Sequence, residues 1–277
     1  MPELPEVETV VRSLRPKLVG KWIKTVRRGR HQLRKPWLAQ WTQQVSDTKI
    51  VSMERRGKWI LLKLSQEGCH LVVHLGMTGR LLVCNSIEQV LSHTHLVFPL
   101  AGGDEELRYV DPRRFGSVRL CQVVDNHRFP EELQLGIEPF GKYSKQLEER
   151  FLASNRSLKA ILLDQSVMAG VGNIYADEAL YRARLNPEWR GNSLTSKQVR
   201  ILVSAVQQVL QRAIDAHGST ILSFYYGDGE AGGFQNEFKV YGRKDLPCYH
   251  CGTPIQRTKL SGRSTHWCPK CQNQTNR

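Results

Sequence analysis

Four cysteines near the carboxyl end form the pattern that most restricts how this chain can fold. Cys248 and Cys251 make one Cys-x-x-Cys pair, Cys268 and Cys271 make a second, and sixteen residues separate the pairs. Each such turn directs two thiolates at one point, so the two pairs together suit a tetrahedral Zn²⁺ ion. We therefore predict one structural zinc ion with these four cysteines as ligands.

The other three cysteines, Cys69, Cys84 and Cys121, lie in apolar strand-like stretches and are expected to pack as small hydrophobic side chains. An odd total of seven argues against a disulfide framework. The amino terminus lacks the basic and apolar regions of a signal peptide, and no apolar run approaches the ~18–20 residues of a membrane span. We expect a cytoplasmic protein.

The zinc segment is also strongly basic. Residues 239–277 carry eight Lys or Arg and one acid, which places +7 of the chain's formal charge of +14 in this segment. Such a surplus favours a polyanionic partner, with nucleic acid the leading candidate. Between the cysteine pairs, residues 258–267 read as a hairpin that turns at Ser261-Gly262. This predicts an exposed Arg263 suited to binding phosphate.

The rest of the chain reads as two regions of different pattern. After a helix that begins near Pro5 and ends at Gly20, residues up to about 120 form short strands without intervening helices, which is typical of a sandwich or barrel. The predicted strands are 59–64, 70–75, 94–98, 107–110 and 117–120.

A stretch rich in Pro and Gly at 131–145 is predicted to be a linker, and the pattern is then helical. A capping box at Thr195-Ser-Lys-Gln198 begins a helix that ends at Gly218, and the glycine-rich Ala169-Gly-Val-Gly-Asn173 lies between two helical segments. Such a turn exposes backbone N–H groups where a phosphate can bind. The predicted domains are therefore 1–130, 146–225 and 226–277, the last containing a mobile loop and the zinc finger.

Removal of Met1 would leave Pro2 as an N-terminal secondary amine. The positive end of the following helix should lower the pKa of this amine, so that a useful fraction is neutral and nucleophilic at pH 7. Condensation with an aldehyde carbon gives an iminium ion, which draws electrons for elimination. Glu3 is a candidate general acid, and Glu6 is expected to accept helix N–H groups. On pattern alone, the simpler interpretation is favoured: the prolines and acids of this stretch merely begin a helix.

Six motifs in chain order, together with the four-cysteine finger, resemble the bacterial formamidopyrimidine-DNA glycosylases, also called DNA-(apurinic or apyrimidinic site) lyases. The motifs are Pro2-Glu-Leu-Pro-Glu-Val-Glu8, Arg55-Arg-Gly-Lys58, His74-Leu-Gly-Met-Thr-Gly79, Asp111-Pro-Arg-Arg-Phe-Gly116, Ala169-Gly-Val-Gly-Asn-Ile-Tyr-Ala-Asp-Glu178 and Val240-Tyr-Gly-Arg243. The resemblance implies an α+β multidomain fold: an N-terminal β-sandwich with flanking helices, a helix–two-turn–helix domain and a C-terminal zinc finger. It also implies a monomer.

The implied activity is base-excision repair of duplex DNA. The enzyme would remove oxidised purines such as 8-oxoguanine and formamidopyrimidines, then cut the strand by β- and δ-elimination. By resemblance, Pro2 attacks C1′ of the damaged nucleotide, Glu3 assists opening of the sugar, Lys58 assists base loss and the first elimination, and Arg263 holds phosphates and assists the second.

The resemblance also assigns contacts with DNA. Met77, Arg113 and Phe115 would fill the space left by the everted base, and the loop 219–238 would close over that base. Phosphates would be held by His74, His93, Asn155, Lys159, Asn173 and Tyr241. Relatives commonly carry lysine where this chain has Asn155, so the side chain there brings no charge. Thr78, beside Met77, is a position where relatives vary in residue type.

Two other functions are open on these grounds. An enzyme resembling endonuclease VIII would share Pro2, Glu3, the glycine turn and the finger but prefer oxidised pyrimidines; Leu4 and the Met77, Arg113 and Phe115 set favour the purine enzyme. A non-catalytic zinc protein that binds DNA would keep all basic features and leave Pro2 idle.

Overall fold

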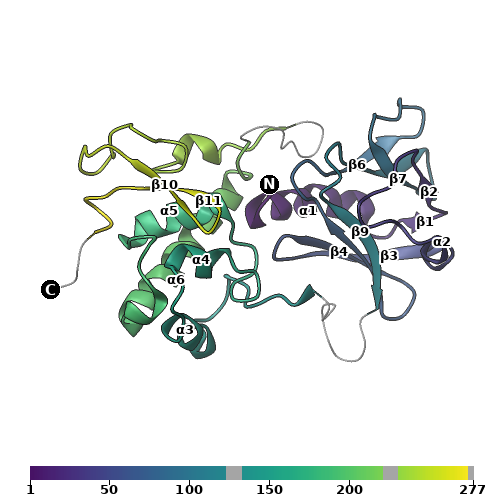
Figure 1. Ribbon diagram of the computed structural model, residues 1–277. Coiled ribbons are helices and arrows are strands. Elements are labelled where there is room, and N and C mark those ends of the chain that lie inside the picture. Colours follow the sequence, from purple (N-terminus) through teal and green to yellow (C-terminus); the bar gives the residue numbers. More distant parts are fainter. Residues whose placement is uncertain (123–132, 221–229, 274–277) are drawn as a thin grey trace. The chain divides into compact units, whose positions relative to one another are not determined.

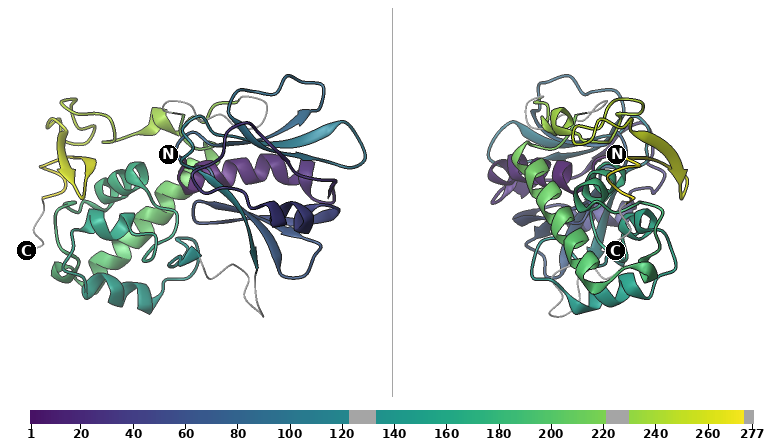
Figure 2. Two further views of the ribbon diagram at one scale, coloured as in Figure 1. Left: turned by 45° about the vertical axis from the view of Figure 1, so that its right-hand side comes forward. Right: turned by 90° about the vertical axis from the view of Figure 1, so that its left-hand side faces the viewer.

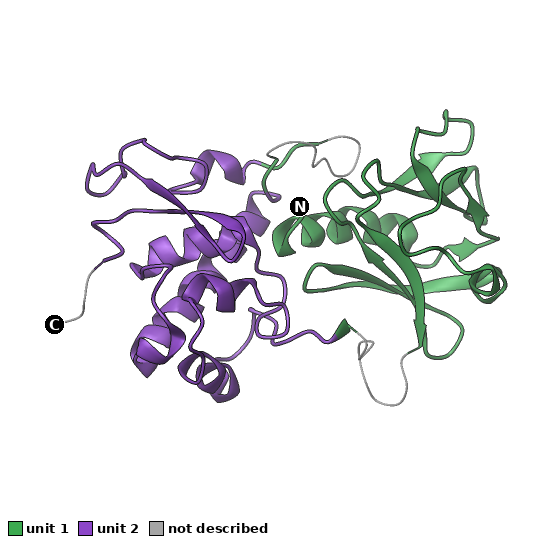
Figure 3. Cartoon of the chain, in the orientation of Figure 1, with its two compact units in different colours: residues 1–133, 219–232 green, residues 134–218, 233–277 purple. Residues whose placement is uncertain are grey.

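The structure is a computed structural model that describes residues 1–122, 133–220 and 230–273 (Figure 1). Its contacts divide the chain into two units (Figure 3). Unit 1 contains residues 1–133 and 219–232, and unit 2 contains residues 134–218 and 233–277. Each unit is described by itself.

Unit 1 is built on two antiparallel sheets. The five-stranded sheet has the order β1-β3-β4-β5-β9, formed by Trp22–Ile23, Thr48–Arg56, Trp59–Leu64, Cys69–His74 and Ser117–Gln122. The four-stranded sheet has the order β2-β7-β8-β6, formed by Arg27–Arg28, Thr94–Pro99, Glu105–Val110 and Arg80–Asn85. The short helix α2 (Ala39–Val45) precedes β3.

Helix α1 (Leu4–Leu18) joins the two sheets into one core. Pro5 lies in its first turn, where the missing N–H costs no hydrogen bond, and Gly20 follows its end with φ +91°. Its apolar side chains, among them Val7, Val11 and Leu18, are fully buried. The helix packs against β3 and β4 of one sheet and β6 of the other (Figure 2). The amino terminus therefore leads directly into an element that lies in the core of unit 1.

Unit 2 combines helices with a small hairpin. Its helices are α3 (Lys145–Leu152), α4 (Leu158–Leu163), α5 (Asn173–Ala183) and α6 (Ser196–Asp215), with 3₁₀ turns η2 (Gly191–Ser193) and η3 (Phe234–Glu237). The predicted capping box of α6 is present: Thr195 Oγ1 accepts from Gln198 N–H, and Gln198 accepts from Thr195 N–H. The hairpin pairs β10 (Gln256–Leu260) with β11 (Arg263–Trp267), and β11 packs on α5.

The fold class predicted from the sequence is confirmed, including the five predicted strands to within two residues at either end. Strands β3 and β6 were not predicted, because charged residues interrupt the alternation of β3 and because β6 is a short apolar run without alternation. The three predicted domain ranges stay a prediction. By contacts, the zinc segment shares a unit with the helices, and the Pro- and Gly-rich residues 134–145 belong to that unit too.

Cys69 and Cys121 are buried as expected, whereas Cys84 on β6 is only half-buried. Residues 221–229 of the predicted mobile loop 219–238 lie outside the described residues. Among the residues that the structure describes, none of the helices combines the length and apolar character needed to cross a bilayer.

Candidate functional site

The amino terminus is held in place by a buried carboxylate. Pro2 and Glu3 are buried, and Glu6 Oε2 accepts from Glu3 N–H at 2.9 Å. The other oxygen of Glu6 accepts from both N–H and Oγ of Ser219, at 2.8 and 2.9 Å. Glu6 thus fixes Glu3, the residue that precedes α1, and joins it to Ser219, which lies far along the chain. This long-range contact was not predicted from the sequence. Once Met1 is removed, the amine of Pro2 would lie beside the Glu3 carboxyl in a backbone that cannot shift freely.

Lys58 lies in the tight turn between β3 and β4, immediately before Trp59, where Arg56 pairs with Trp59. Gly57 takes φ +57° in this turn. The Lys58 side chain is only 6% exposed, which is unusual for a lysine. Its ammonium is close enough to His74 to affect that side chain electrostatically. The turn therefore holds a cation in a partly dehydrated place, as a residue that acts on developing charge requires.

His74 ends β5 with a fixed, neutral ring. Its Nδ1 accepts from Gly76 N–H at 3.0 Å, so the neutral imidazole carries its proton on Nε2. Burial, together with the positive charges of Lys58, Lys35 and Arg119, lowers the pKa of His74 to about 4. A neutral Nε2–H donor in positive surroundings suits a phosphate oxygen.

The three predicted wedge residues are carried by two loops of unit 1. Met77 and Phe115 are each 38% exposed and Arg113 is exposed, so none of the three is a core side chain. The Arg113 guanidinium carbon lies 4.8 Å from the centre of the Phe115 ring. Exposed large apolar side chains next to a cation suit insertion between bases.

One buried carboxylate joins these two loops. Asp111 Oδ1 accepts from Thr78 Oγ1 at 2.6 Å, and Oδ2 accepts from Gly116 N–H at 2.8 Å. Thr78 Oγ1 in turn accepts from Arg113 N–H at 3.2 Å. Close approach requires glycine, because a Cβ on Gly76 would lie 2.4 Å from Gly116 N. Thr78 and Asp111 therefore set the spacing of the wedge residues, a role that the sequence analysis did not assign.

His93 precedes β7 in a left-handed conformation (φ +63°) with an exposed side chain. Its carbonyl accepts from Asp111 N–H at 3.1 Å, which ties it to the wedge loop. Unit 1 thus brings Lys58 and His74 together at one place and ties His93 to the loop that carries Arg113 and Phe115.

In unit 2, the glycine turn leads into α5 with Gly172 as its N-cap and Asn173 as its first residue. The structure corrects the expectation for Lys159. Its side chain is fully buried, forms an ion pair with Asp177, and donates to Asn173 O at 3.0 Å. A fully buried ammonium held by a carboxylate does not face a phosphate, so Lys159 supports the turn from within.

Asp177 also holds the hairpin. Its Oδ2 accepts from His266 N–H at 2.9 Å, and the His266 ring nitrogen Nδ1 lies 3.3 Å from the same oxygen. The Tyr241 ring meets His266 edge-on at 5.1 Å between centres. A buried Glu178, whose pKa is raised by burial, accepts from the N–H groups of Lys239, Val240 and Tyr241. Asn173, Tyr241 and the Arg263 hairpin are therefore parts of one hydrogen-bonded assembly.

Asn155 is exposed and has a partner that the sequence analysis missed. Its Oδ1 accepts from Arg190 Nη1 at 2.6 Å. The guanidinium of Arg190 is exposed, so a positive charge lies beside the uncharged Asn155 amide. The residues are 35 apart in sequence, and no local motif connects them.

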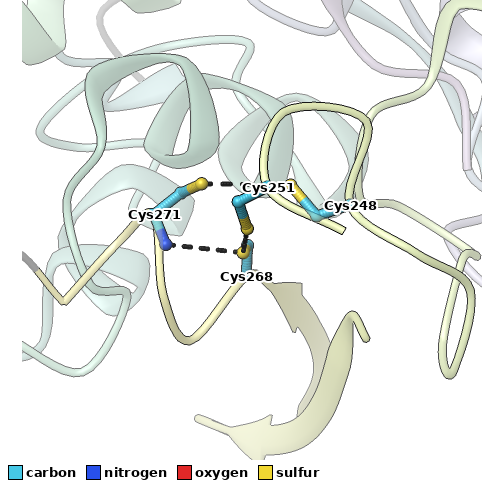
Figure 4. A group of neighbouring side chains, drawn as sticks. All are labelled: Cys248, Cys251, Cys268 and Cys271. Atoms are coloured by element: carbon cyan, nitrogen blue, oxygen red, sulfur yellow. Dashed lines mark hydrogen bonds between the residues drawn. The ribbon is translucent and has the colours of Figure 1, made fainter. Parts of the chain in front are cut away.

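The four predicted zinc ligands lie together (Figure 4). Their Sγ atoms are all within 4.8 Å of one another, with Cys251 to Cys268 at 3.5 Å and Cys248 to Cys271 at 3.9 Å. Tetrahedral coordination at the usual Zn–S length of about 2.3 Å needs sulfur separations of about 3.8 Å, so the cluster fits one zinc ion. The ion would contribute structure and no chemistry, because all four positions are taken by thiolates.

The hairpin places Arg263 where the sequence predicts. Leu260 pairs with Arg263 across a two-residue turn, in which Ser261 and Gly262 have φ +49° and +74°. These values are those of a tight hairpin turn that requires a left-handed backbone at both positions. The Arg263 side chain is exposed at the first position of β11.

Comparison with known proteins identifies the family. Residues 1–118 match the formamidopyrimidine-DNA glycosylase N-terminal domain, residues 135–224 match the H2TH domain of the same enzymes, and residues 245–274 match a zinc finger found in FPG and IleRS. This chain belongs to the formamidopyrimidine-DNA glycosylase family. Family members from Pelotomaculum thermopropionicum and Halalkalibacterium halodurans are 41% and 43% identical over 98% of this chain, and the matches cover 99% and 100% of those proteins.

Solved structures of the family agree. The MutM (Fpg) protein of Thermus thermophilus has a TM-score of 0.85 and 40% identity, with 99% of this chain and 100% of that chain covered. Lactococcus lactis Fpg, in complex with DNA that contains N7-benzyl-Fapy-dG, has a TM-score of 0.87 and 33% identity over the same shares. The family places the four-cysteine cluster and the H2TH helices in a DNA-repair glycosylase.

Proposed function

We propose that this protein is a bifunctional glycosylase and lyase of base-excision repair that acts on oxidised purines in duplex DNA. The substrates would be 8-oxoguanine and formamidopyrimidines. The observation that supports this proposal most directly is that Pro2 and Glu3 are buried and held in place at the start of α1. Two relatives support the substrate class: Lactococcus lactis Fpg bound to DNA that contains N7-benzyl-Fapy-dG, and a MutM bound to DNA with carbocyclic 8-oxo-G.

In the first step, the neutral amine of Pro2 would attack C1′ of the damaged nucleotide as the bond from C1′ to the base breaks. The base leaves with the electron pair of that bond and takes up a proton. The Glu3 carboxyl would give a proton to the ring oxygen, which opens the sugar and leaves a C1′ iminium ion on Pro2. A buried carboxyl is suited to this role because burial favours its protonated form.

In the lyase steps, the iminium would accept electrons as a proton leaves C2′ and the 3′ phosphate departs. Loss of a proton from C4′ and departure of the 5′ phosphate would follow. Each departing phosphate carries negative charge, which a nearby cation stabilises. We assign Lys58 to the first elimination and Arg263 to the second, because Lys58 is buried beside His74 and Arg263 is exposed on a stiff turn.

Contacts with DNA would come from both units. Met77, Arg113 and Phe115 would occupy the space of the everted base, which costs a few kcal/mol to leave the stack. His74, His93, Asn173 and Tyr241 would hold phosphates, and Asn155 would do so together with Arg190. We also propose that the protein acts as a monomer in the bacterial cytoplasm, on the DNA of the nucleoid.

The test compares the excision of two lesions and uses borohydride to trap the covalent intermediate. Protein from which Met1 has been removed should excise 8-oxoguanine opposite cytosine faster than thymine glycol, and borohydride should trap a covalent adduct that maps to Pro2. A preference for thymine glycol would indicate an enzyme like endonuclease VIII. DNA binding with no adduct would indicate a non-catalytic protein, and an adduct on an internal lysine would exclude Pro2 as the nucleophile.

A further inference from the structure

A short basic loop of unit 1, residues 29–35, has no part in the function proposed above. Four of its seven residues are Arg30, His31, Arg34 and Lys35. It follows the two-residue edge strand β2 and precedes α2. We call it the basic loop, and we call residues 111–116, which carry Arg113 and Phe115, the wedge loop.

The basic loop has a fixed backbone, although most of its side chains are exposed. Gly29 N–H donates to His95 O at 2.9 Å, and a Cβ on Gly29 would lie 1.9 Å from Thr94 O, so only glycine fits against β7. Leu33 within the loop and Trp37 just after it are buried in the core of unit 1. Residues between these anchors, Arg34 among them, therefore start from a defined position.

Hydrogen bonds tie the basic loop to the wedge loop. The buried ring of His95 lies between them, with Nδ1 2.8 Å from His31 O and Nε2 2.9 Å from Asp111 O. The Arg114 guanidinium donates to Gln32 O at 3.5 Å. The two loops are 76 or more residues apart in sequence and are held as one piece.

Arg34 contacts the wedge residue itself. Its guanidinium carbon lies 4.1 Å from the centre of the Phe115 ring, closer than the 4.8 Å of Arg113. This distance is within the range of a cation–π contact. An apolar ring that is more than a third exposed would otherwise have little to hold it in one orientation.

The charge of the basic loop also acts on the proposed phosphate site. Lys35 is one of three cations whose positive charge lowers the pKa of His74, the others being Lys58 and Arg119. The basic loop thus lies close to two features of the proposed DNA interface, Phe115 and His74.

We propose that Arg34 is a positioning residue that holds Phe115 ready for insertion into the base stack, and that the basic loop is a further DNA-binding segment. This inference rests on the proposed function. Before DNA binds, the planar guanidinium covers the ring. The contact persists until the ring has begun to enter the stack, so it stabilises the transition state of insertion. The faces of two bases then replace it, and Arg34 becomes available to a phosphate. The order of events requires a contact that is favourable but weak enough to break, as a single partly exposed cation–π contact is.

The experiment measures insertion separately from chemistry. Duplex DNA with a tetrahydrofuran abasic analogue and 2-aminopurine beside it reports unstacking by stopped-flow fluorescence, and the analogue cannot be excised. The variants are Arg34→Ala, Arg34→Lys, and Arg30→Ala as the matched control, which removes the same charge from the same loop. Neither Arg30 nor Arg34 is buried, so the variants should fold.

We expect Arg34→Ala to slow the fluorescence phase about tenfold, the kinetic equivalent of a partly desolvated cation–π contact. Arg34→Lys should recover part of the rate, because it restores a cation without the stacking plane. Arg30→Ala should keep the wild-type insertion rate. Both alanine variants should lower the slope of log affinity against log salt by about 1 if the loop contacts phosphate.

Equal insertion rates for Arg34→Ala and Arg30→Ala would overturn the positioning role, and unchanged salt slopes would overturn the DNA-binding role of the loop. The proposed function fails separately, by the absence of excision and of a borohydride adduct in the wild-type protein. The fluorescence assay needs neither, so the two failures are distinguishable.

Discussion

The amino terminus of unit 1 and the zinc hairpin of unit 2 prepare their key residues by opposite means. Pro2 and Glu3 are buried at the start of a helix that contacts both sheets of a large apolar core, and a buried carboxylate fixes them. Arg263 is exposed on a hairpin whose small core is made of Val240, Ile255 and zinc-ligating cysteines. One site is rigid because it is packed, and the other because it binds a metal.

The difference follows from the chemistry proposed for each end. A neutral amine nucleophile gains from burial, which disfavours its charged form, whereas an arginine that binds phosphate must keep its guanidinium accessible. A segment with so few apolar side chains cannot supply its own stability, so the metal supplies it. The positive charge of the finger would attract DNA of any sequence, and the uncharged amine would make the encounter a reaction.

The largest expected effect comes from blocking the amine. One additional serine retained ahead of Pro2 should lower excision by about 10³-fold or more, because the amide nitrogen that results is not nucleophilic. Affinity for abasic-analogue DNA should stay within about threefold of wild type, since every proposed phosphate contact is retained. Single-turnover excision and fluorescence anisotropy measure the two quantities.

Excision at near wild-type rate by the extended protein would show that a free Pro2 amine is not required for the reaction. Mass spectrometry of the intact amino terminus is the control, because a minor fraction lacking the serine would retain activity.

Loss of zinc should affect the zinc hairpin of unit 2 and, through it, the affinity for DNA. Cys268→Ser is expected to abolish binding of the ion, loosen the hairpin and weaken DNA affinity about tenfold or more, because the four-thiolate site stabilises the fold around it. Arg263→Gln is the matched variant, since it removes the exposed cation and keeps the zinc. Native mass spectrometry counts zinc and anisotropy measures affinity.

If Cys268→Ser bound DNA as tightly as wild type, the metal would not be what positions Arg263. If Arg263→Gln also lost zinc, the two variants would not separate charge from structure, which the exposure of Arg263 argues against.

The same contrast explains what could be predicted from the sequence. The finger, its turn and the helix α6 have local signals: cysteine spacing, Ser261-Gly262 and a capping box. The residues that support the sites have none. Asp111 with Thr78, Glu6 with Ser219, and Lys159 with Asp177 are pairs of polar residues 18 or more positions apart that meet only in the folded chain.

Lys159 shows why a residue type does not decide its role. A lysine beside a glycine turn suits a phosphate contact, and the family resemblance assigned one, yet the side chain is turned inward to an aspartate that also holds the hairpin. Only the three-dimensional position of Asp177 distinguishes the two roles.

A smaller effect is expected from the pH dependence of unit 1. The pKa of His74 is lowered from 6.5 to about 4, chiefly by burial. Above pH 6.5 the ring is neutral in both the folded and unfolded chain. Between pH 6.5 and about 4 the unfolded chain binds a proton that the fold does not, so stability falls as the pH falls, and below pH 4 this contribution levels off.

His74→Gln should flatten that part of the profile, because the amide does not titrate and its oxygen can still accept from Gly76 N–H. Urea unfolding at pH 7, 5.5 and 4.5 measures the change. An equal loss of stability in both proteins over this range would place the responsible group elsewhere.

The smallest expected effect concerns the exposed pair in unit 2. Arg190→Ala should weaken DNA affinity about threefold and lower the salt slope by about 1, as expected for one lost phosphate contact. Asn155→Ala should weaken affinity by less and keep the slope, because it removes an amide that orients Arg190 and leaves the charge. Arg212→Ala is the control, since that exposed arginine is paired with Glu237.

An Asn155→Lys variant sharpens the comparison. The added charge should strengthen DNA binding, and it should reduce the loss of affinity caused by Arg190→Ala. A larger loss from Asn155→Ala than from Arg190→Ala would assign the phosphate contact to the amide and leave Arg190 as its support.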